Sequence, residues 1–212
     1  MSFVQDLKWW LKLRLARRNC FKKNLVPKFE KLHLGCGTRH FGNWVNVDGV
    51  RSDLNLDLSQ GKLPWENDCF KTIVSQHVIE HLELHSELIP LFRELHRVVR
   101  PGGRVWLSCP DMEVVCAGYQ ADKGARILAS VQRRHPSFEL AEGAPTQQVV
   151  NYLFHQKRQH RNLFDFELLE WALKHAGFSK VTQANEQELI ENEPDVAHRD
   201  DDDISLYVFA EK

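Results

Sequence analysis

The six residues from Leu32 to Gly37 constrain the fold more than any other stretch of this sequence. An apolar run breaks there into a Gly-x-Gly turn, and a second run over residues 44–48 ends on Asp48. Glycine allows the backbone to approach a ligand closely, and a carboxylate at the end of the second strand accepts hydrogen bonds from two ribose hydroxyls. The order strand, glycine turn, strand, acid predicts a nucleoside-containing ligand at the edge of a parallel sheet.

The connection between these two strands is short. It holds only the eight residues from Cys36 to Asn43, fewer than the roughly 10 to 12 that a crossover with its helix needs. A dinucleotide fold uses that helix to hold a pyrophosphate, and His40 stands where the third glycine of a G-x-G-x-x-G motif would pack the helix. The spacing therefore favours a cofactor without phosphate.

Short strands alternate with helical segments along the rest of the chain. This pattern predicts an α/β fold: a Rossmann-like, open, mostly parallel sheet of about seven strands, with helices on both faces and a shortened first crossover. The expected strands cover residues 31–35, 44–48, 53–58, 72–74, 104–108, 181–182 and 204–210, and the clearest helices cover 87–99 and 165–176. Arg100-Pro101-Gly102-Gly103 is expected to break the chain between helix and strand.

The length of 212 residues, with 42% apolar residues, predicts one domain with a real core. We assign residues 1–30 to an N-terminal helix and linker, and residues 31–212 to the main domain. Residues 112–163 are polar and carry several histidines. We expect them to form an insertion over the carboxyl edge of the sheet, above the acceptor site, because open α/β folds bind ligands at that edge.

Residues 3–23 read as a basic amphipathic helix. Phe3, Val4, Leu7, Trp10, Leu11 and Leu15 recur at helical spacing, and this segment holds seven Lys and Arg residues against one Asp. Two interpretations stay open. The helix, with Trp9 and Trp10, closes a sheet face that the missing first helix leaves uncovered, or it docks peripherally on an anionic membrane.

Charge and cysteine content narrow the class of protein. The 28 basic and 29 acidic residues nearly cancel, so no global field argues for nucleic acid as a partner. Five scattered cysteines with no C-x-x-C pair, and no signal-peptide pattern, predict a reducing, cytoplasmic location. No apolar run reaches the ~18 residues of a transmembrane helix. The pattern thus predicts a soluble protein, peripheral to the inner face of a membrane at most; its oligomeric state is left undetermined.

Several motifs together resemble the class I S-adenosylmethionine-dependent methyltransferases. They are the Gly-x-Gly turn, the acid at Asp48, the acid-apolar pair Asp57-Leu58, the Leu-Pro-Trp loop at 63–65, the segment 75–82 and the Arg-Pro-Gly-Gly break. More narrowly, the pattern Gly-x-x-x-Asn-x-Asp, Val-x-Glu-His-Leu, Pro-Asp and Asp-Phe-x-x-Leu resembles a predicted, largely uncharacterised branch of that class. That branch is often linked to polysaccharide and cell-envelope biosynthesis.

The resemblance implies S-adenosyl-L-methionine as cofactor and assigns residues to it. Gly35 and Gly37 would face its methionine part, Asp48 its ribose, and Asp57 with Leu58 its adenine. For Asp57 a plain turn or cap remains an alternative. The full set of expected cofactor contacts comprises Gly35, Cys36, Gly37, Asp48, Asp57, Leu58, Ser75 and His77.

Three residues are candidates for the chemistry. His77 follows the fourth strand, where an imidazole serves as general base or as an acceptor contact, with a supporting role as alternative. Asp111 ends the fifth strand and either binds the acceptor or caps the next helix. His160 belongs to a polar cluster with Asn151, His155 and Arg161, which is either the acceptor side or a solvated loop.

The segment 80–85 also contains possible metal ligands. Glu80, His81 and His85 have a spacing that one helix face would bring together, but residues 83–86 are expected to interrupt the helix, so we predict no metal. Nor is there a Walker loop or a nucleophile elbow.

The sequence thus predicts a methyltransferase for a small-molecule or saccharide acceptor, with O-methylation favoured. The alternative is a non-catalytic relative that recruits partners through its N-terminal helix.

Overall fold

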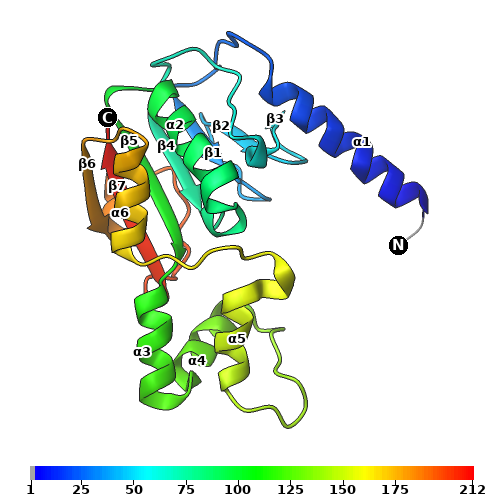
Figure 1. Ribbon diagram of the computed structural model, residues 1–212, viewed down its shortest axis with the longest axis vertical. Coiled ribbons are helices and arrows are strands. Elements are labelled where there is room, and N and C mark those ends of the chain that lie inside the picture. The colour runs from blue at the N-terminus through cyan, green and yellow to red at the C-terminus, as the bar shows by residue number, and fades with distance from the viewer. Residues whose placement is uncertain (1–2) are drawn as a thin grey trace.

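The computed structural model describes the backbone of residues 3–212 and the side chains of residues 11–212. Its centre is a seven-stranded sheet in the order β3-β2-β1-β4-β5-β7-β6 (Figure 1). The strands are β1 (Lys31–Leu34), β2 (Val45–Asp48), β3 (Leu54–Asn55), β4 (Phe70–Gln76), β5 (Val99–Pro110), β6 (Lys180–Ala184) and β7 (Ser205–Glu211). Only β7 runs antiparallel to its neighbours in this sheet. The predicted fold class is confirmed.

Alternation along the strands separates two apolar faces. Leu32, Ile73 and Leu107 belong to the larger core, which includes buried residues of α2 (Ile89–Val98) and α6 (Phe166–His175). Both helices cross the same face of the sheet in Figure 1. Val74 and Trp106 point the other way, into a smaller cluster with Leu189 of α7 (Glu186–Asn192). The period of two in a strand therefore places helices on both faces.

The first crossover is short, as predicted. Residues 35–44 contain turns and bends but no helix. Phe41 and Trp44 of this connection are buried in the smaller cluster, together with Val196, which follows α7. The sheet face left bare by the missing helix is thus covered by these aromatic rings and by the α7 segment. No residue of this cluster comes from the part of the N-terminal helix whose side chains are described.

The N-terminal helix, α1 (Phe3–Cys20), ends against the β3 edge of the sheet. Ala16 and Cys20 are buried, and Asn19 donates its side-chain amide to the Asn55 carbonyl at 3.0 Å. Earlier along α1, Leu11 and Leu15 are about half exposed. The structure does not describe the side chains of five residues on the predicted apolar face: Phe3, Val4, Leu7, Trp9 and Trp10. No helix in the described part of the chain is long and apolar enough to span a membrane.

Some element boundaries differ from the prediction for local reasons. The strand expected over 53–58 stops at Asn55, because Asp57 caps a short 3-10 turn, η1 (Leu58–Gln60). The helix expected over 87–99 begins earlier, with a π turn, η3 (Leu84–Leu88). β5 starts at Val99 and continues through the expected break, and its register with β4 shifts between Phe70 and Thr72. Asp165 caps α6 as predicted: its carboxylate accepts a hydrogen bond from Leu168 N at 2.8 Å.

Residues between β5 and α6 form a helical layer at the carboxyl end of β5. It contains α3 (Met112–Asp122), α4 (Ala125–Arg134), α5 (Gln147–His155) and the short turn η4 (Gln156–Arg158). Figure 1 shows these helices grouped at one end of the sheet. Val115, Ile127, Val149 and Leu153 give them an apolar cluster of their own. This layer is where the predicted insertion falls, over the edge at which parallel strands end.

Burial of His33 makes stability depend on pH. Its ring is 3% exposed and stacks on Phe41 with centroids 3.9 Å apart, and this burial lowers the pKa of His33 to about 4. The unfolded chain, with an ordinary histidine pKa near 6.5, then binds more protons in the window between. The free energy of unfolding should therefore fall by up to about 3 kcal/mol as pH drops from about 6.5 to about 4. Denaturant titrations at several pH values measure this dependence. The free energy of unfolding should change less steeply with pH in His33→Phe, which keeps the ring stack, than in the wild type. An equal pH dependence in the two proteins would contradict the assignment.

Candidate active site

The glycine turn after β1 has the geometry that its sequence predicts. Gly35 and Gly37 both have positive φ, +68° and +54°, a backbone region that L side chains rarely adopt. A Cβ on Gly35 would lie 2.0 Å from Val78 Cγ2, whereas a Cβ on Gly37 would meet nothing within 4 Å. Gly35 is therefore required for packing within the protein, and Gly37 leaves open space beside the turn.

Asp48 at the end of β2 is joined to this turn. Its carboxylate accepts hydrogen bonds from Gly37 N at 2.9 Å and from Gly49 N at 2.6 Å. The side chain remains partly accessible. The β1–β2 edge therefore presents a fixed carboxylate next to an open stretch of backbone.

These groups border a cavity of about 350 Å³, here named the smaller cavity. Gly35 of the turn, Asp48, Asp57 and Ser59 line one part of it, and leucine side chains from four segments line another. The lining comprises Leu13, Gly35, Asp48, Gly49, Leu56, Asp57, Leu58, Ser59, His77, Val78, His81 and Leu82. Its size and its mixture of apolar wall and few polar groups are typical of small-molecule sites.

Asp57 lines the smaller cavity, but its carboxylate already has several partners. One oxygen accepts from Ser59 N and from the Ser59 hydroxyl, and the other accepts from Arg17 Nε at 2.7 Å. The cap that the sequence left as an alternative is thus present. Leu58 beside it is 8% exposed.

Three of the expected cofactor contacts do not line the smaller cavity. Cys36 is buried and, like Gly37, borders a second, larger cavity; burial and the nearby Asp48 raise the pKa of the Cys36 thiol to about 12. Ser75 is buried within β4 and lines neither cavity, whereas its neighbour Gln76 lines the larger one. Successive residues of a strand face opposite ways, so the site receives Gln76 in place of Ser75.

The larger cavity has a volume of about 940 Å³. It lies between the glycine turn, the residues after β4, the helical layer and the loop before β7. Three residues, Gly35, His77 and His81, line both cavities; we name them the shared wall. A ligand in one cavity would therefore contact the same groups as a ligand in the other.

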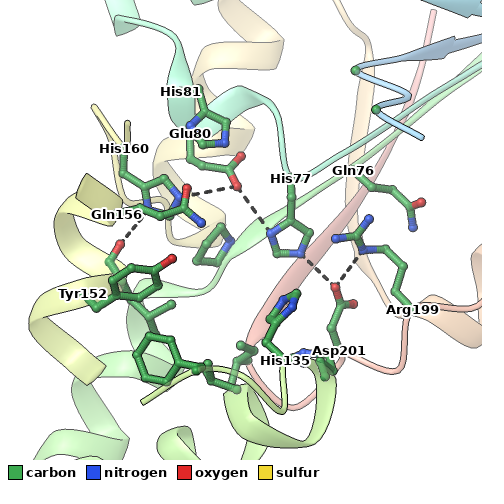
Figure 2. Close-up of a pocket in the computed structure, with 18 of the residues that line it drawn as sticks. Gln76, His77, Glu80, His81, His135, Tyr152, Gln156, His160, Arg199 and Asp201 are labelled. Atoms are coloured by element: carbon green, nitrogen blue, oxygen red, sulfur yellow. Dashed lines mark hydrogen bonds and ion pairs between the residues drawn. The ribbon is translucent and has the colours of Figure 1, made fainter. Parts of the chain in front are cut away.

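His77 in the shared wall contacts two buried carboxylates (Figure 2). Its Nε2 lies 2.9 Å from Asp201 Oδ2, and its Nδ1 lies 3.4 Å from Glu80 Oε1. Since a carboxylate only accepts, both ring nitrogens carry protons. Burial lowers the pKa of His77, but the bonds to Asp201 and Glu80 outweigh it and hold this pKa above its usual value. Both ring nitrogens of His77 are thus engaged by carboxylates in this arrangement.

Asp201 is tied in place by two further donors. Tyr207 donates its hydroxyl at 2.6 Å and Arg199 donates its Nε at 3.0 Å. Burial raises the pKa of Asp201, but the bonds from His77 and Tyr207 keep this pKa well below its usual range. Two cations, His77 and Arg199, therefore balance the charges of Glu80 and Asp201.

The other two catalytic candidates differ in position. Asp111 accepts from Glu113 N at 2.8 Å and from Val114 N at 3.3 Å, so it caps α3, and it lines neither cavity. His160 does line the larger cavity and donates Nδ1 to the Leu153 carbonyl at 2.6 Å. Burial lowers the pKa of His160. Of the cluster proposed with it, Asn151, His155 and Arg161 do not line the cavity.

Sequence reasoning missed three residues of the larger cavity. Asp201 and Arg199 lie in an acidic segment that has no motif spacing, so only the fold brings them to His77. Gln76 is 5% exposed, lines the larger cavity, and neither its amide nitrogen nor its amide oxygen has a hydrogen-bond partner in the described structure. Its place directly before His77 was the one available signal.

Comparison with known proteins identifies the family. A family model described as a methyltransferase domain matches residues 12–183. The chain therefore belongs to this family of methyltransferase domains. Comparison with curated protein sequences gives no match.

Solved structures of similar fold have low sequence identity. The CMeT domain of the citrinin polyketide synthase is 12% identical with a TM-score of 0.50, over 88% of this chain and 47% of that one. A Thermotoga maritima S-adenosylmethionine-dependent methyltransferase is 15% identical (TM-score 0.49; 99% and 96% of the chains). Phosphoethanolamine N-methyltransferase 2 of Haemonchus contortus is 16% identical (TM-score 0.47; 100% and 53%). The present chain thus spans about half the length of the Haemonchus enzyme.

The smaller cavity fits S-adenosylmethionine, the cofactor that the sequence resemblance implies. Gly35 brings backbone without a side chain to its wall, and Asp48 offers acceptor oxygens for hydroxyl groups. Leu56, Leu58 and Leu82 supply an apolar surface for a base. No phosphate-binding helix follows β1, and the cofactor carries no phosphate.

Alanine substitutions should separate the two glycines. Gly35→Ala places Cβ against Val78 in addition to a strained φ, and should lower the free energy of unfolding by about 2 kcal/mol or more. Gly37→Ala carries only the backbone strain, about 1 kcal/mol, but its methyl group enters open space at the border of the larger cavity, where the resemblance places the methionine part, and should weaken S-adenosylhomocysteine binding. Chemical unfolding measures the stability of both variants, and calorimetric titration measures their affinity for S-adenosylhomocysteine. Equal stability losses would contradict the geometry.

Proposed function

We propose that this protein transfers a methyl group from S-adenosylmethionine to a hydroxyl oxygen of a small polar molecule or a saccharide. The observation that carries the proposal is the shared wall. Gly35, His77 and His81 border both a cavity that fits the cofactor and a larger cavity next to it. Methyl transfer requires donor and acceptor to meet in line at one point, and the shared wall supplies such a point.

The cofactor residues are proposed as follows. Gly35 and Gly37 face the methionine part, Asp48 accepts from the ribose hydroxyls, and Leu58 packs against adenine. Asp57 takes part through its position in the cavity wall, since its oxygens are engaged by Ser59 and Arg17. The bound cofactor supplies a methyl group already activated by a sulfonium charge. The protein's task is then to align the acceptor and to manage its proton.

His77 is proposed to act by position and charge. Its ring, held by Glu80 and Asp201, fixes the point where the cavities meet. Truncating it would leave two buried carboxylates without their shared partner, which is costly in a buried site. His160 is proposed to face the acceptor from the opposite wall.

The acceptor is proposed to be polar because of what lines the larger cavity. The amide of Gln76 is buried without a partner and can donate to one oxygen and accept from one hydroxyl. Tyr152, Gln156 and Ser137 add further polar groups to the lining. A buried polar group without a partner costs free energy until a ligand satisfies it. A molecule with several hydroxyls, such as a saccharide of the cell envelope, fits this lining best.

The cofactor assignment can be tested by calorimetric titration with S-adenosylhomocysteine. Asp48→Asn removes the charge but keeps the shape, and should weaken binding roughly 10- to 100-fold, the cost of losing hydrogen bonds to a charged acceptor. Glu66→Gln is the control, because Glu66 is exposed and lines neither cavity. No binding by the wild-type protein, or equal affinities of wild type and Asp48→Asn, would overturn the proposal.

Peripheral contact with a membrane is proposed for the exposed part of α1. Leu11 and Leu15 are 52% and 53% exposed, lie four residues apart, and have the exposed cations Lys12 and Arg18 nearby in sequence. Apolar and basic side chains on one short helix are typical of interfacial anchors.

Vesicle sedimentation tests the membrane contact. Wild type should bind phosphatidylcholine vesicles that contain phosphatidylglycerol, and Leu11→Ser with Leu15→Ser should bind several-fold less. Trp171→Ala is the control, since Trp171 is also exposed but belongs to α6. If the double variant sediments like the wild type, α1 does not form the contact.

A further inference from the structure

Three potential metal ligands from distant parts of the chain meet beside the larger cavity. Glu80 and His81 belong to the short turn η2 (Ile79–His81) after β4, and His160 follows η4. One ligand atom of each residue lies within 4.8 Å of the others. Figure 2 shows His160 and Glu80 facing each other, with His81 beside them. His85, which the sequence spacing grouped with Glu80 and His81, is exposed and does not belong to this group.

Both histidines are oriented as metal ligands are. His81 Nδ1 lies 3.2 Å from the Gln159 carbonyl oxygen, and His160 Nδ1 lies 2.6 Å from the Leu153 carbonyl oxygen. A carbonyl only accepts, so each Nδ1 carries the proton and each Nε2 keeps its lone pair. Metal-binding histidines are commonly held this way, with the second nitrogen donating to a carbonyl.

Glu80 gives an independent reason to expect a cation. Its side chain is 1% exposed, and its Oε1 faces His77 Nδ1 at 3.4 Å. Its other oxygen, Oε2, is buried and has no hydrogen-bond partner in the described structure. An unpartnered carboxylate oxygen in a buried site is costly, and a metal ion would satisfy it.

The backbone holds the three residues in place. Arg161 N and Asn162 N donate to the Glu80 carbonyl at 2.8 and 3.2 Å, and the Asn162 side chain donates to the Leu82 carbonyl. The residues after η4 are thus fastened to η2. The ligand set is assembled before any ion binds.

We propose that Glu80, His81 and His160 bind one divalent transition-metal ion of the zinc type, with an open coordination position toward the larger cavity. Two imidazole nitrogens and one carboxylate suit zinc, whereas magnesium and calcium prefer all-oxygen sites. Three protein ligands with one open position are the arrangement of catalytic zinc sites. All three residues line the larger cavity, so the open position would face the acceptor.

The role of the ion, unlike its binding, rests on the proposed function. The acceptor hydroxyl would occupy the open position, where a metal lowers the pKa of a bound hydroxyl, and its proton would pass to solvent water. The oxygen–methyl bond then forms as the sulfur–methyl bond breaks, and the sulfonium becomes a neutral thioether.

The test titrates the full chain, freed of any affinity tag and treated with EDTA, with zinc alone in competition with a chromogenic chelator. Wild type should bind one equivalent. His81→Ala and His160→Ala should each bind on the order of 100-fold more weakly, since loss of a ligand exceeds the 10- to 100-fold effect of losing a supporting contact. His85→Ala, an exposed histidine four residues from His81, should bind as the wild type does.

Cobalt provides a second readout that is independent of affinity. Wild type loaded with cobalt should show visible absorption bands that His81→Ala and His160→Ala lack. Thermal unfolding of the metal-free proteins shows whether each variant folds, and Glu80→Gln offers a third substitution in which the shape is kept. Absence of zinc binding by the wild type overturns the proposal, as does equal weakening in His85→Ala or undiminished binding in folded His81→Ala and His160→Ala.

A parallel titration with S-adenosylhomocysteine separates this inference from the proposed function. Zinc binding without S-adenosylhomocysteine binding supports the metal site and overturns the methyltransferase proposal. S-adenosylhomocysteine binding without zinc binding supports the methyltransferase proposal and overturns the metal site.

Discussion

The His77 ring joins two segments of the chain that lie 124 positions apart in the sequence. His77 follows β4, Glu80 lies on η2, and Asp201 lies in the loop before β7, yet both carboxylates contact the same imidazole. Buried charges are tolerated only when each has a well-placed partner. The position of the C-terminal loop, of η2 and of the residues after η4 that bond to Glu80 therefore depends on this one cation. Arg199 and Tyr207 complete the arrangement by engaging the other side of Asp201.

The short connection after β1 has a structural cost and a chemical consequence. Without a helix there, Phe41 and Trp44 fold back on the sheet, and α7 with Val196 covers the rest of that face. His33 becomes buried beneath Phe41 in the process. In exchange, the turn is free of a helix N-terminus that would favour phosphate, and Asp48 can bind Gly37 N directly.

The sequence allowed the fold and the geometry of the glycine turn with Asp48 to be predicted because their signals are local. Gly35, Gly37 and Asp48 lie within one strand-turn-strand unit, so residue type and spacing were enough. The acceptor side depends on contacts between distant residues: His160 lies about 80 positions from Glu80, and Asp201 lies 124 positions from His77. Local capping also competed with binding, since Asp57 and Asp111 are both residues that favour caps, and both cap. The choice between Ser75 and Gln76 depends only on which face of β4 each side chain points to, and the sequence did not specify this.

The two cavities divide the chain into parts with different freedom to change. Asp48 of β2 and Leu58 and Ser59 of η1 line only the smaller cavity, whereas the helical layer between β5 and α6 lines only the larger one, which most of the glycine turn also borders. That layer has its own apolar cluster, so its side chains toward the larger cavity can change without disturbing the packing beneath the smaller one. Under the proposed function, substitutions that change the acceptor therefore belong in this one layer. The shared wall is the exception: a change at His77 or His81 alters the lining of both cavities at once.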